Sequence, residues 1–337
     1  MHSAAVRTRV SLALLAVVIL AAVGMAATAS GSVAVAKQAT QLVVFIAPRT
    51  GTVGARLEVI DRSGHVLRVL STAHYGTWGH WSPDDASIAW EDPTGIHVEG
   101  ADGSSPRLLV PACQTCAQLS FTWSPDSRSL AVGSAGAKGN QLQLVPIDGS
   151  APTVLVGSTN PKRVFAPAWW TPGGALVYTD ARVNSASMRT LNPATGKTMT
   201  LWSTSMAQGF NAPYISHDLR YWAYVDQDHH LARIIDKQTG HTRIVEGVNP
   251  TNLNSWSPDS KALGITASGG YILTVSPTGT ILHRFGPGEQ LDWGHDSSEL
   301  FIYRANYSQI YASENDGTPR LLLRLPKNRW VVSLDAN

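Results

Sequence analysis

The tetrapeptide Trp256-Ser257-Pro258-Asp259 decides the fold, because the chain repeats it. Identical copies stand at Trp81-Ser82-Pro83-Asp84 and Trp123-Ser124-Pro125-Asp126. Degraded copies begin at Trp170, Ile215, Trp293 and Val332. The seven starts, at positions 81, 123, 170, 215, 256, 293 and 332, lie 37 to 47 residues apart. A repeat of about 40 residues is typical of an architecture in which one supersecondary unit recurs.

The unit that begins near Trp123 predicts four short antiparallel strands. Ser-Pro-Asp favours a turn, because proline presets φ and the aspartate side chain can accept a hydrogen bond from the backbone two residues on. Apolar or alternating runs follow at 130–132, 142–145 and 153–156, and Asp148-Gly149 favours a hairpin between the last two. The segment that carries Trp123 supplies the fourth strand.

A second turn signal repeats independently of the first. A glycine that follows a strand-like run recurs at Gly64, Gly103, Gly149, Gly196, Gly240, Gly279 and Gly317. The motif and the glycine turn therefore each occur seven times. Seven four-stranded units repeated radially predict an all-β, seven-bladed β-propeller with antiparallel blades. Six blades is the alternative, if the motif at Val332 is fortuitous and the N-terminal strands form a cap.

The two ends of the repeat region complement each other. The first unit, 41–70, has the later strands of a blade without the tryptophan segment, and the last, 329–337, has that segment alone. We therefore predict that the C-terminal strand at 330–333 pairs with 42–46 and closes the ring. Such closure removes exposed sheet edges.

Residues 1–36 predict an export segment. Arg7 and Arg9 precede an uncharged apolar stretch, and Ala27-Thr28-Ala29 and Ala34-Val35-Ala36 offer small-residue cleavage sites. The stretch is also nearly long enough to span a bilayer, so it is either a cleaved signal peptide or an N-terminal membrane anchor. In both cases the propeller, residues 37–337, is expected to be secreted or to lie in the extracytoplasmic cell envelope, with no membrane contact beyond that anchor.

The charge balance argues against nucleic acid as a partner. The chain has 26 Lys plus Arg and 24 Asp plus Glu, and removal of Arg7 and Arg9 leaves 24 of each. A chain near zero net charge lacks the basic footprint of a nucleic-acid-binding protein. We expect a monomer that binds a protein or a peptide.

The only cysteines are Cys113 and Cys116. No second pair exists to complete a zinc site, and the βαβ setting of a thioredoxin-like site is absent. A local disulfide in an oxidising compartment is therefore preferred over a redox or metal site.

The residues that recur in every unit are interpreted as structural. Large aromatic side chains bury much area, so the motif tryptophans are expected to wedge between neighbouring blades, and the motif aspartates to hold turns. These residues are Trp81, Trp123, Trp170, Trp256 and Trp293, and Asp84, Asp126, Asp218, Asp259, Asp296 and Asp335.

With Trp-Ser-Pro-Asp, an apolar triplet and a hairpin ending in Asp-Gly or Thr-Gly, residues 41–337 resemble the TolB-type β-propeller family, also described as a PD-type, WD-like repeat. The resemblance is specific for the units at Trp81, Trp123 and Trp256. It implies an exported platform for protein contacts. The family's glycine after the aspartate is replaced by Asp85, Ser127, Ser260 and Ser297, so looser first turns are expected.

One face of a propeller carries the loops that enter each innermost strand and those between the second and third strands. The candidate ligand-binding rim on this face comprises His74, Tyr75, Arg163, Phe165, Asp180, Arg182, Phe210, Asn211, Asp226, Asp228, His229, Arg304, Asn306 and Tyr307. A mixed polar and aromatic rim suits a binding face, although an ordinary solvated loop surface has the same composition. The cluster 226–230 could bind a divalent metal, but a solvated turn is preferred, and no metal or cofactor is assigned.

Three function hypotheses follow. The first is a non-catalytic platform at the cell envelope that binds a protein or peptide, because the chain has no Gly-x-Ser-x-Gly nucleophile elbow. The second is a propeller enzyme, a metal-dependent lyase or a lactonase-type hydrolase, which rests on fold analogy alone. The third is a carbohydrate-binding module that uses the rim aromatics.

Overall fold

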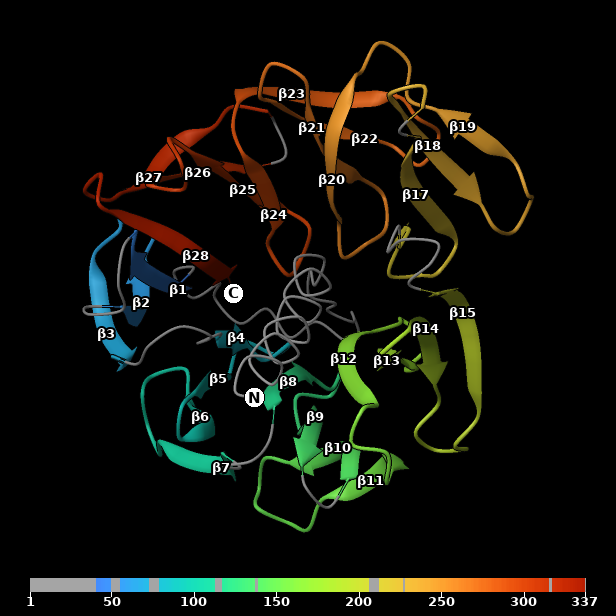
Figure 1. Ribbon diagram of the computed structural model, residues 1–337. Helices are drawn as coiled ribbons and strands as arrows, with labels where there is room; N and C mark the ends of the chain where they lie inside the picture. The colour runs from blue at the N-terminus through green and yellow to red at the C-terminus, as the bar shows by residue number, and fades with distance from the viewer. Residues whose placement is uncertain are drawn as a thin grey trace, which may run out of the picture.

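The computed structural model describes residues 41–49, 55–72, 79–112, 117–136, 139–205, 212–226, 228–314 and 317–336. These residues form 28 strands in seven four-stranded antiparallel sheets arranged as a ring (Figure 1). The prediction of an all-β, seven-bladed propeller is confirmed, and the six-bladed alternative is wrong. The described part of the chain has no helix of the length and apolarity needed to cross a bilayer.

Six blades are each built from four consecutive strands. Blade 1 contains β4 (Gly79–Trp81), β5 (Ser87–Asp92), β6 (Gly95–Gly100) and β7 (Arg107–Pro111). Blade 2 contains β8 (Ala117–Trp123), β9 (Ser129–Gly136), β10 (Gly139–Pro146) and β11 (Thr153–Ser158). Blade 3 contains β12 (Val164–Trp170), β13 (Leu176–Arg182), β14 (Ser185–Leu191) and β15 (Thr198–Ser205).

The remaining blades follow the same order. Blade 4 contains β16 (Tyr214–Ile215), β17 (Tyr221–Asp226), β18 (Leu231–Asp236) and β19 (Thr242–Ile244). Blade 5 contains β20 (Pro250–Trp256), β21 (Leu263–Ala267), β22 (Tyr271–Val275) and β23 (Ile281–Pro287). Blade 6 contains β24 (Gln290–Trp293), β25 (Glu299–Arg304), β26 (Gln309–Glu314) and β27 (Arg320–Arg324). The closing blade joins β28 (Arg329–Ala336) to β1 (Gln41–Pro48), β2 (Arg56–Asp61) and β3 (Val66–Ser71).

The ring closes by pairing of the last strand with the first, as the sequence predicts. β28 runs antiparallel to β1, from Leu42 opposite Ala336 to Pro48 opposite Arg329. The turn expected at 332–335 is wrong, because these residues lie within β28. Ala336 pairs with Leu42 as Trp81 pairs with Ile88. Ala336 therefore occupies the motif-tryptophan position of the closing blade, and Asp335 occupies the position just before it.

The hydrophobic core lies between neighbouring blades. The first strand of each blade lies nearest the centre of the ring and the fourth at its periphery (Figure 1). One cluster joins Ala223 and Ile234 of blade 4 to Leu253 and Trp256 of blade 5. The inner strands of each sheet contact a neighbouring blade on both faces. β1 is therefore buried along six consecutive residues, whereas the outer strand β3 is largely exposed.

Three motif tryptophans also link neighbouring blades by hydrogen bonds. The indole Nε1–H of Trp123 donates to the carbonyl of His80 at 3.0 Å, across the junction of blades 1 and 2. Trp256 donates to Tyr214 at 2.9 Å, and Trp293 donates to Ser255 at 3.0 Å. In each case the acceptor is the residue just before the motif position of the preceding blade.

The first turns are not looser where glycine is replaced. In the six copies that form a turn, the residue after the fourth motif position has positive φ, including Asp85 (59°), Ser127 (59°), Ser260 (62°) and Ser297 (64°). Its N–H donates to the carbonyl three residues earlier at 2.8–3.2 Å, as it does at Gly174. A serine is accommodated because its hydroxyl accepts a hydrogen bond from the preceding blade, and this offsets the strain of the left-handed conformation.

These serine links join the turns of consecutive blades. The backbone N–H of Asp84 donates to Ser127 Oγ at 3.1 Å, that of Asp218 to Ser260 Oγ at 3.1 Å, and that of Asp259 to Ser297 Oγ at 2.9 Å. The seven glycines of the second turn signal all have positive φ, from 67° to 89°, as a tight hairpin requires.

Candidate functional site

The alternating strand direction sorts the connections onto two faces. The motif turns and the glycine turns lie at one end of the blades, and the loops that carry the predicted rim lie at the other, which we call the loop face. Of the predicted rim, His74, Tyr75, Phe210 and Asn211 lie outside the described residues, as do Cys113 and Cys116 of the predicted disulfide.

Three rim residues of blade 3 contact one another. Arg163 donates two hydrogen bonds to the Asp180 carboxylate, at 2.8 and 2.7 Å, and its guanidinium lies 4.8 Å from the centre of the Phe165 ring. Asp180 is 4% exposed and Phe165 1% exposed. The bond to Asp180 raises the pKa of Arg163. This group braces β12 against β13, and Arg182 is the exposed charge beside it.

Asp226 and residues 228–230 of the predicted cluster lie at the connection between β17 and β18 and form local ion pairs. Asp226 lies 3.0 Å from His229 Nδ1 and accepts a hydrogen bond from Arg233 Nε at 2.8 Å. The bonds from His229 and then Arg233 lower the pKa of Asp226 to about 2. His229 and Asp228 are exposed. Over the described residues, no group of three or more His, Cys, Asp or Glu could hold a metal ion.

Among the described loops of the loop face, the turn between β25 and β26 has the most unusual backbone. Ala305, Asn306 and Tyr307 have φ of 53°, 57° and 60°, three consecutive non-glycine residues in the left-handed region. Each such residue costs about 1–2 kcal/mol. We call residues 305–308 the strained turn.

Neighbouring segments hold the strained turn in place. The backbone N–H of Asn306 donates to the Glu289 carboxylate at 2.9 Å, and the Arg49 guanidinium donates to the Asn306 carbonyl. The N–H of Val331 donates to the Tyr307 carbonyl at 2.8 Å. Glu289 directly precedes β24, Arg49 directly follows β1, and Val331 belongs to β28.

Aromatic packing completes the support of this turn. The Tyr307 ring lies between Tyr303, with centroids 5.5 Å apart, and Trp330, at 6.2 Å. Its hydroxyl donates to Gln290 Oε1 at 3.4 Å. Nearby, Arg304 donates to the carbonyl of Phe285 at 2.7 Å and lies over the ring of Tyr311. Strained backbone persists only where the surroundings over-determine it, as they do here.

A second group of residues, absent from the predicted rim, lies on the innermost strands. The position just before each motif residue is never aliphatic, and it holds His80, Thr122, Trp169, Tyr214, Ser255, Asp292 and Asp335. The residue type at this fixed position of the repeat was the sequence signal that could have identified these side chains. Our sequence reasoning followed the tryptophan and the turn and missed the residue before them.

The acidic members of this position have strongly shifted pKa values. Burial raises the pKa of Asp335 well above its usual range, and the charges of Asp85 and Asp292 raise it further. Burial also raises the pKa of Asp292, although bonds from Tyr303 and Gln290 oppose the shift. Burial lowers the pKa of His80 to about 4. These side chains are therefore biased towards their neutral forms, and such shifts often mark functional sites.

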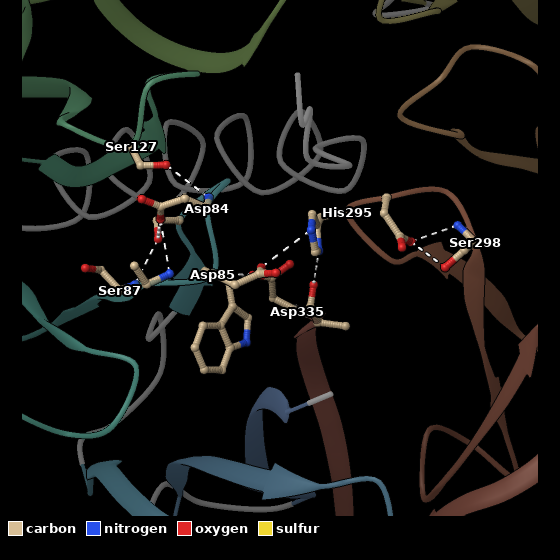
Figure 2. Close-up of polar contacts among 12 residues, drawn as sticks. Asp84, Asp85, Ser87, Ser127, His295, Ser298 and Asp335 are labelled. Atoms are coloured by element: carbon tan, nitrogen blue, oxygen red, sulfur yellow. Dashed lines mark hydrogen bonds and ion pairs between the residues drawn. The ribbon is translucent and has the colours of Figure 1, made fainter. Parts of the chain in front are cut away.

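The group meets where the ring closes. Asp335 is 6% exposed, and its Oδ2 accepts the backbone N–H of Trp81 at 2.7 Å, with His80 Nδ1 at 3.8 Å. His295 of blade 6 reaches over the end of β28, with Nδ1–H donating to the Ala336 carbonyl at 3.0 Å and Nε2 lying 3.5 Å from Asp85 (Figure 2). We call this region, around β24, β28 and β4, the closing seam.

No family model matches the chain, and no curated protein matches its sequence. Solved propeller structures match its fold. An oligogalacturonate lyase in complex with manganese aligns at TM-score 0.56 and 14% identity, over 89% of this chain and 86% of that one. Apo AztD from Citrobacter koseri aligns at TM-score 0.56 and 10% identity, over 89% and 98%.

TolB from Acinetobacter baumannii also aligns, at TM-score 0.48 and 12% identity, over 88% of this chain and 82% of that one. A score of this size does not separate a TolB relationship from a shared architecture. At such identities the likenesses show the propeller fold and leave the activity open.

Proposed function

We propose that the chain is an exported, non-catalytic β-propeller whose loop face binds a protein or peptide partner at the cell envelope. The strained turn is the observation that carries the proposal. It is a rigid feature on the face where propellers present their loops, and it includes two residues of the predicted rim, Asn306 and Tyr307. Export rests on the sequence of residues 1–36.

The physical argument is pre-organisation. A loop that is already ordered loses little conformational freedom when a partner binds, so more of the contact energy appears as affinity. Asn306 and the neighbouring Lys327 are exposed, and Tyr307 is half-buried. Together they present an amide, a cation and the edge of an aromatic ring in a fixed arrangement.

The test uses a matched pair of variants on the same face. Asn184 lies in the turn between β13 and β14, is exposed as Asn306 is, and belongs to a blade across the ring (Figure 1). Protein 37–337 is cross-linked to envelope extract, and captured proteins are identified by mass spectrometry. We expect N306R to lose a partner that the wild type and N184R both retain. Identical capture by both variants would place the binding surface elsewhere.

An enzyme is the second candidate, and the closing seam favours it. Burial raises the pKa of the Asp292 carboxyl, and a raised pKa favours the protonated form that a general acid needs. The solved lyase structure contains manganese, but the described residues offer no ligand set for a metal. A turnover assay on oligosaccharides and lactones, with D292N as the control, tests this candidate. A glycan array with Y307A likewise tests carbohydrate binding.

A further inference from the structure

The closing seam lacks the indole and serine links that join blades 1 and 2, blades 4 and 5, and blades 5 and 6. No indole is available from β28 to blade 6, because Ala336 stands at the motif position. The Nε1–H of Trp81, which is fully buried, has no hydrogen-bond partner among the described residues. The seam is instead bridged by ionisable side chains, Asp335 to the Trp81 N–H and His295 to Asp85 and Ala336.

Several elements packed around Asp335 bring a titratable group to it, whereas its pairing partner β1 brings none. β24 contributes Asp292, β25 contributes Tyr303, β4 contributes His80, and the turns contribute Asp85 and His295. No arginine or lysine is among these groups. Gln290 donates to Asp292 at 3.3 Å and accepts from Tyr307, so the carboxyls are also connected to the strained turn.

We propose that the closing seam is a proton-dependent latch, in which ionisation of Asp335 and Asp292 weakens the attachment of β28 to blade 1. Asp335 is 6% exposed. If it ionises, its charge lies near the Asp292 carboxyl, and no arginine or lysine is among the groups around it to balance that charge. Buried charge without such a partner is unfavourable. The proposal concerns ring closure and does not depend on the proposed binding function.

The sign follows from proton linkage. A carboxyl whose native pKa exceeds the unfolded value, about 3.9, binds more protons in the closed state. Its contribution to stability is therefore complete at low pH and is lost as the pH rises through the native pKa. His80 acts in the opposite direction, since its native pKa of about 4 is below its ordinary value of 6.5. Its contribution is lost as the pH falls from 6.5 to 4.

Hydrogen exchange of the intact protein at pH 5 and pH 8, corrected for intrinsic exchange rates, measures the latch. The readout is the protection of β28 amides and the Trp81 amide relative to the amides of β20–β23. Between pH 5 and 6.5 His80 is neutral in the closed state and protonated in the open one, so it opposes the response, and the measurement is made in the H80N background. There we expect the ratio to fall on raising the pH, by about tenfold for each unit of pKa elevation within the range.

The near-isosteric variant D335N should remove most of this fall while keeping an acceptor for the Trp81 N–H. D292N gives an independent reading if D335N does not fold. D126N, in a motif turn of blade 2, is the matched control and should keep the full response. In the H80N background, a ratio that is constant or rises with pH, or an unchanged fall in both seam variants, would overturn the proposal.

Discussion

The junctions around blade 5 and the closing seam solve the same packing problem with different chemistry. At blade 5, Trp256 donates to the carbonyl of Tyr214 and the hydroxyl of Ser260 accepts the N–H of Asp218. At the seam, the Asp335 carboxyl accepts the N–H of Trp81, and His295 spans the gap. Backbone and hydroxyl groups do not titrate near neutral pH, whereas the seam groups include acids and imidazoles.

The difference teaches that the repeat supplies the same indole and serine links at three junctions, whereas the closing seam depends on special contacts. The closing blade has no motif turn, because β28 and β1 are the last and first strands. Among the described residues, the carboxyls with raised pKa values and the strained turn lie at or next to that blade.

Removal of β28 is the strongest test of this comparison. Deleting residues 329–337 exposes the edge of β1 and uncovers Leu42 and Val44, which are buried. We expect a loss of more than about 5 kcal/mol, comparable with the whole stability of many domains. Thermal unfolding followed by circular dichroism measures it, and an unchanged melting temperature would contradict the ring closure described above.

His80 should give the seam its own pH response. Its lowered pKa contributes a rise in stability between pH 4 and pH 6.5 of at most about 3 kcal/mol, opposite in sign to the contribution of the seam carboxyls. In urea unfolding at several pH values, the stability of H80N should therefore increase less with pH, or decrease more, than that of the wild type. H230N, in the exposed turn of blade 4, is the control, and equal slopes for both variants would show that His80 does not contribute.

Paired tryptophan substitutions compare the junctions directly. W256F loses the indole bond to Tyr214, whereas W81F loses an indole N–H that has no partner in the described residues. We expect W256F to cost about 1 kcal/mol more than W81F, since that is the net value of a typical hydrogen bond. Denaturant titration measures both, and the reverse order would mean that the seam tryptophan is better satisfied than its neighbour.

The smallest expected effect concerns the turn at Ser260. S260A loses the acceptor for the Asp218 N–H and keeps the left-handed backbone, at a cost of about 1 kcal/mol. S260G loses the same bond but relieves the strain at φ 62°, so its cost should be smaller. If S260A and S260G have equal unfolding free energies, backbone strain at this position is negligible.

Much of the fold was predictable from local residues. The Trp-Ser-Pro-Asp turns and the hairpin glycines gave the blade number, because turn chemistry acts within four residues and does not need the rest of the chain. The complementary ends predicted the closure of β28 on β1. The turn predicted at 332–335 is wrong, because a matching spacing does not show whether a segment turns or continues as a strand.

The candidate site was less predictable. Asn306 and Tyr307 were in the predicted rim, but their left-handed backbone depends on Glu289, Arg49 and Val331, which come from distant parts of the chain. Arg163 and Asp180 were also in the rim, and the structure pairs them with each other. Sequence composition identifies charged loop residues and does not show which charges are already paired.

The sequence by itself determined the repeat, the strand count and the way the ends meet, because these follow from periodicity and from turn residues that act locally. Only the tertiary structure decided that Asp292, Asp335 and His80 come together at the closing seam. Their shifted pKa values arise from desolvation and from charges on other strands, and those quantities exist only once the ring has formed.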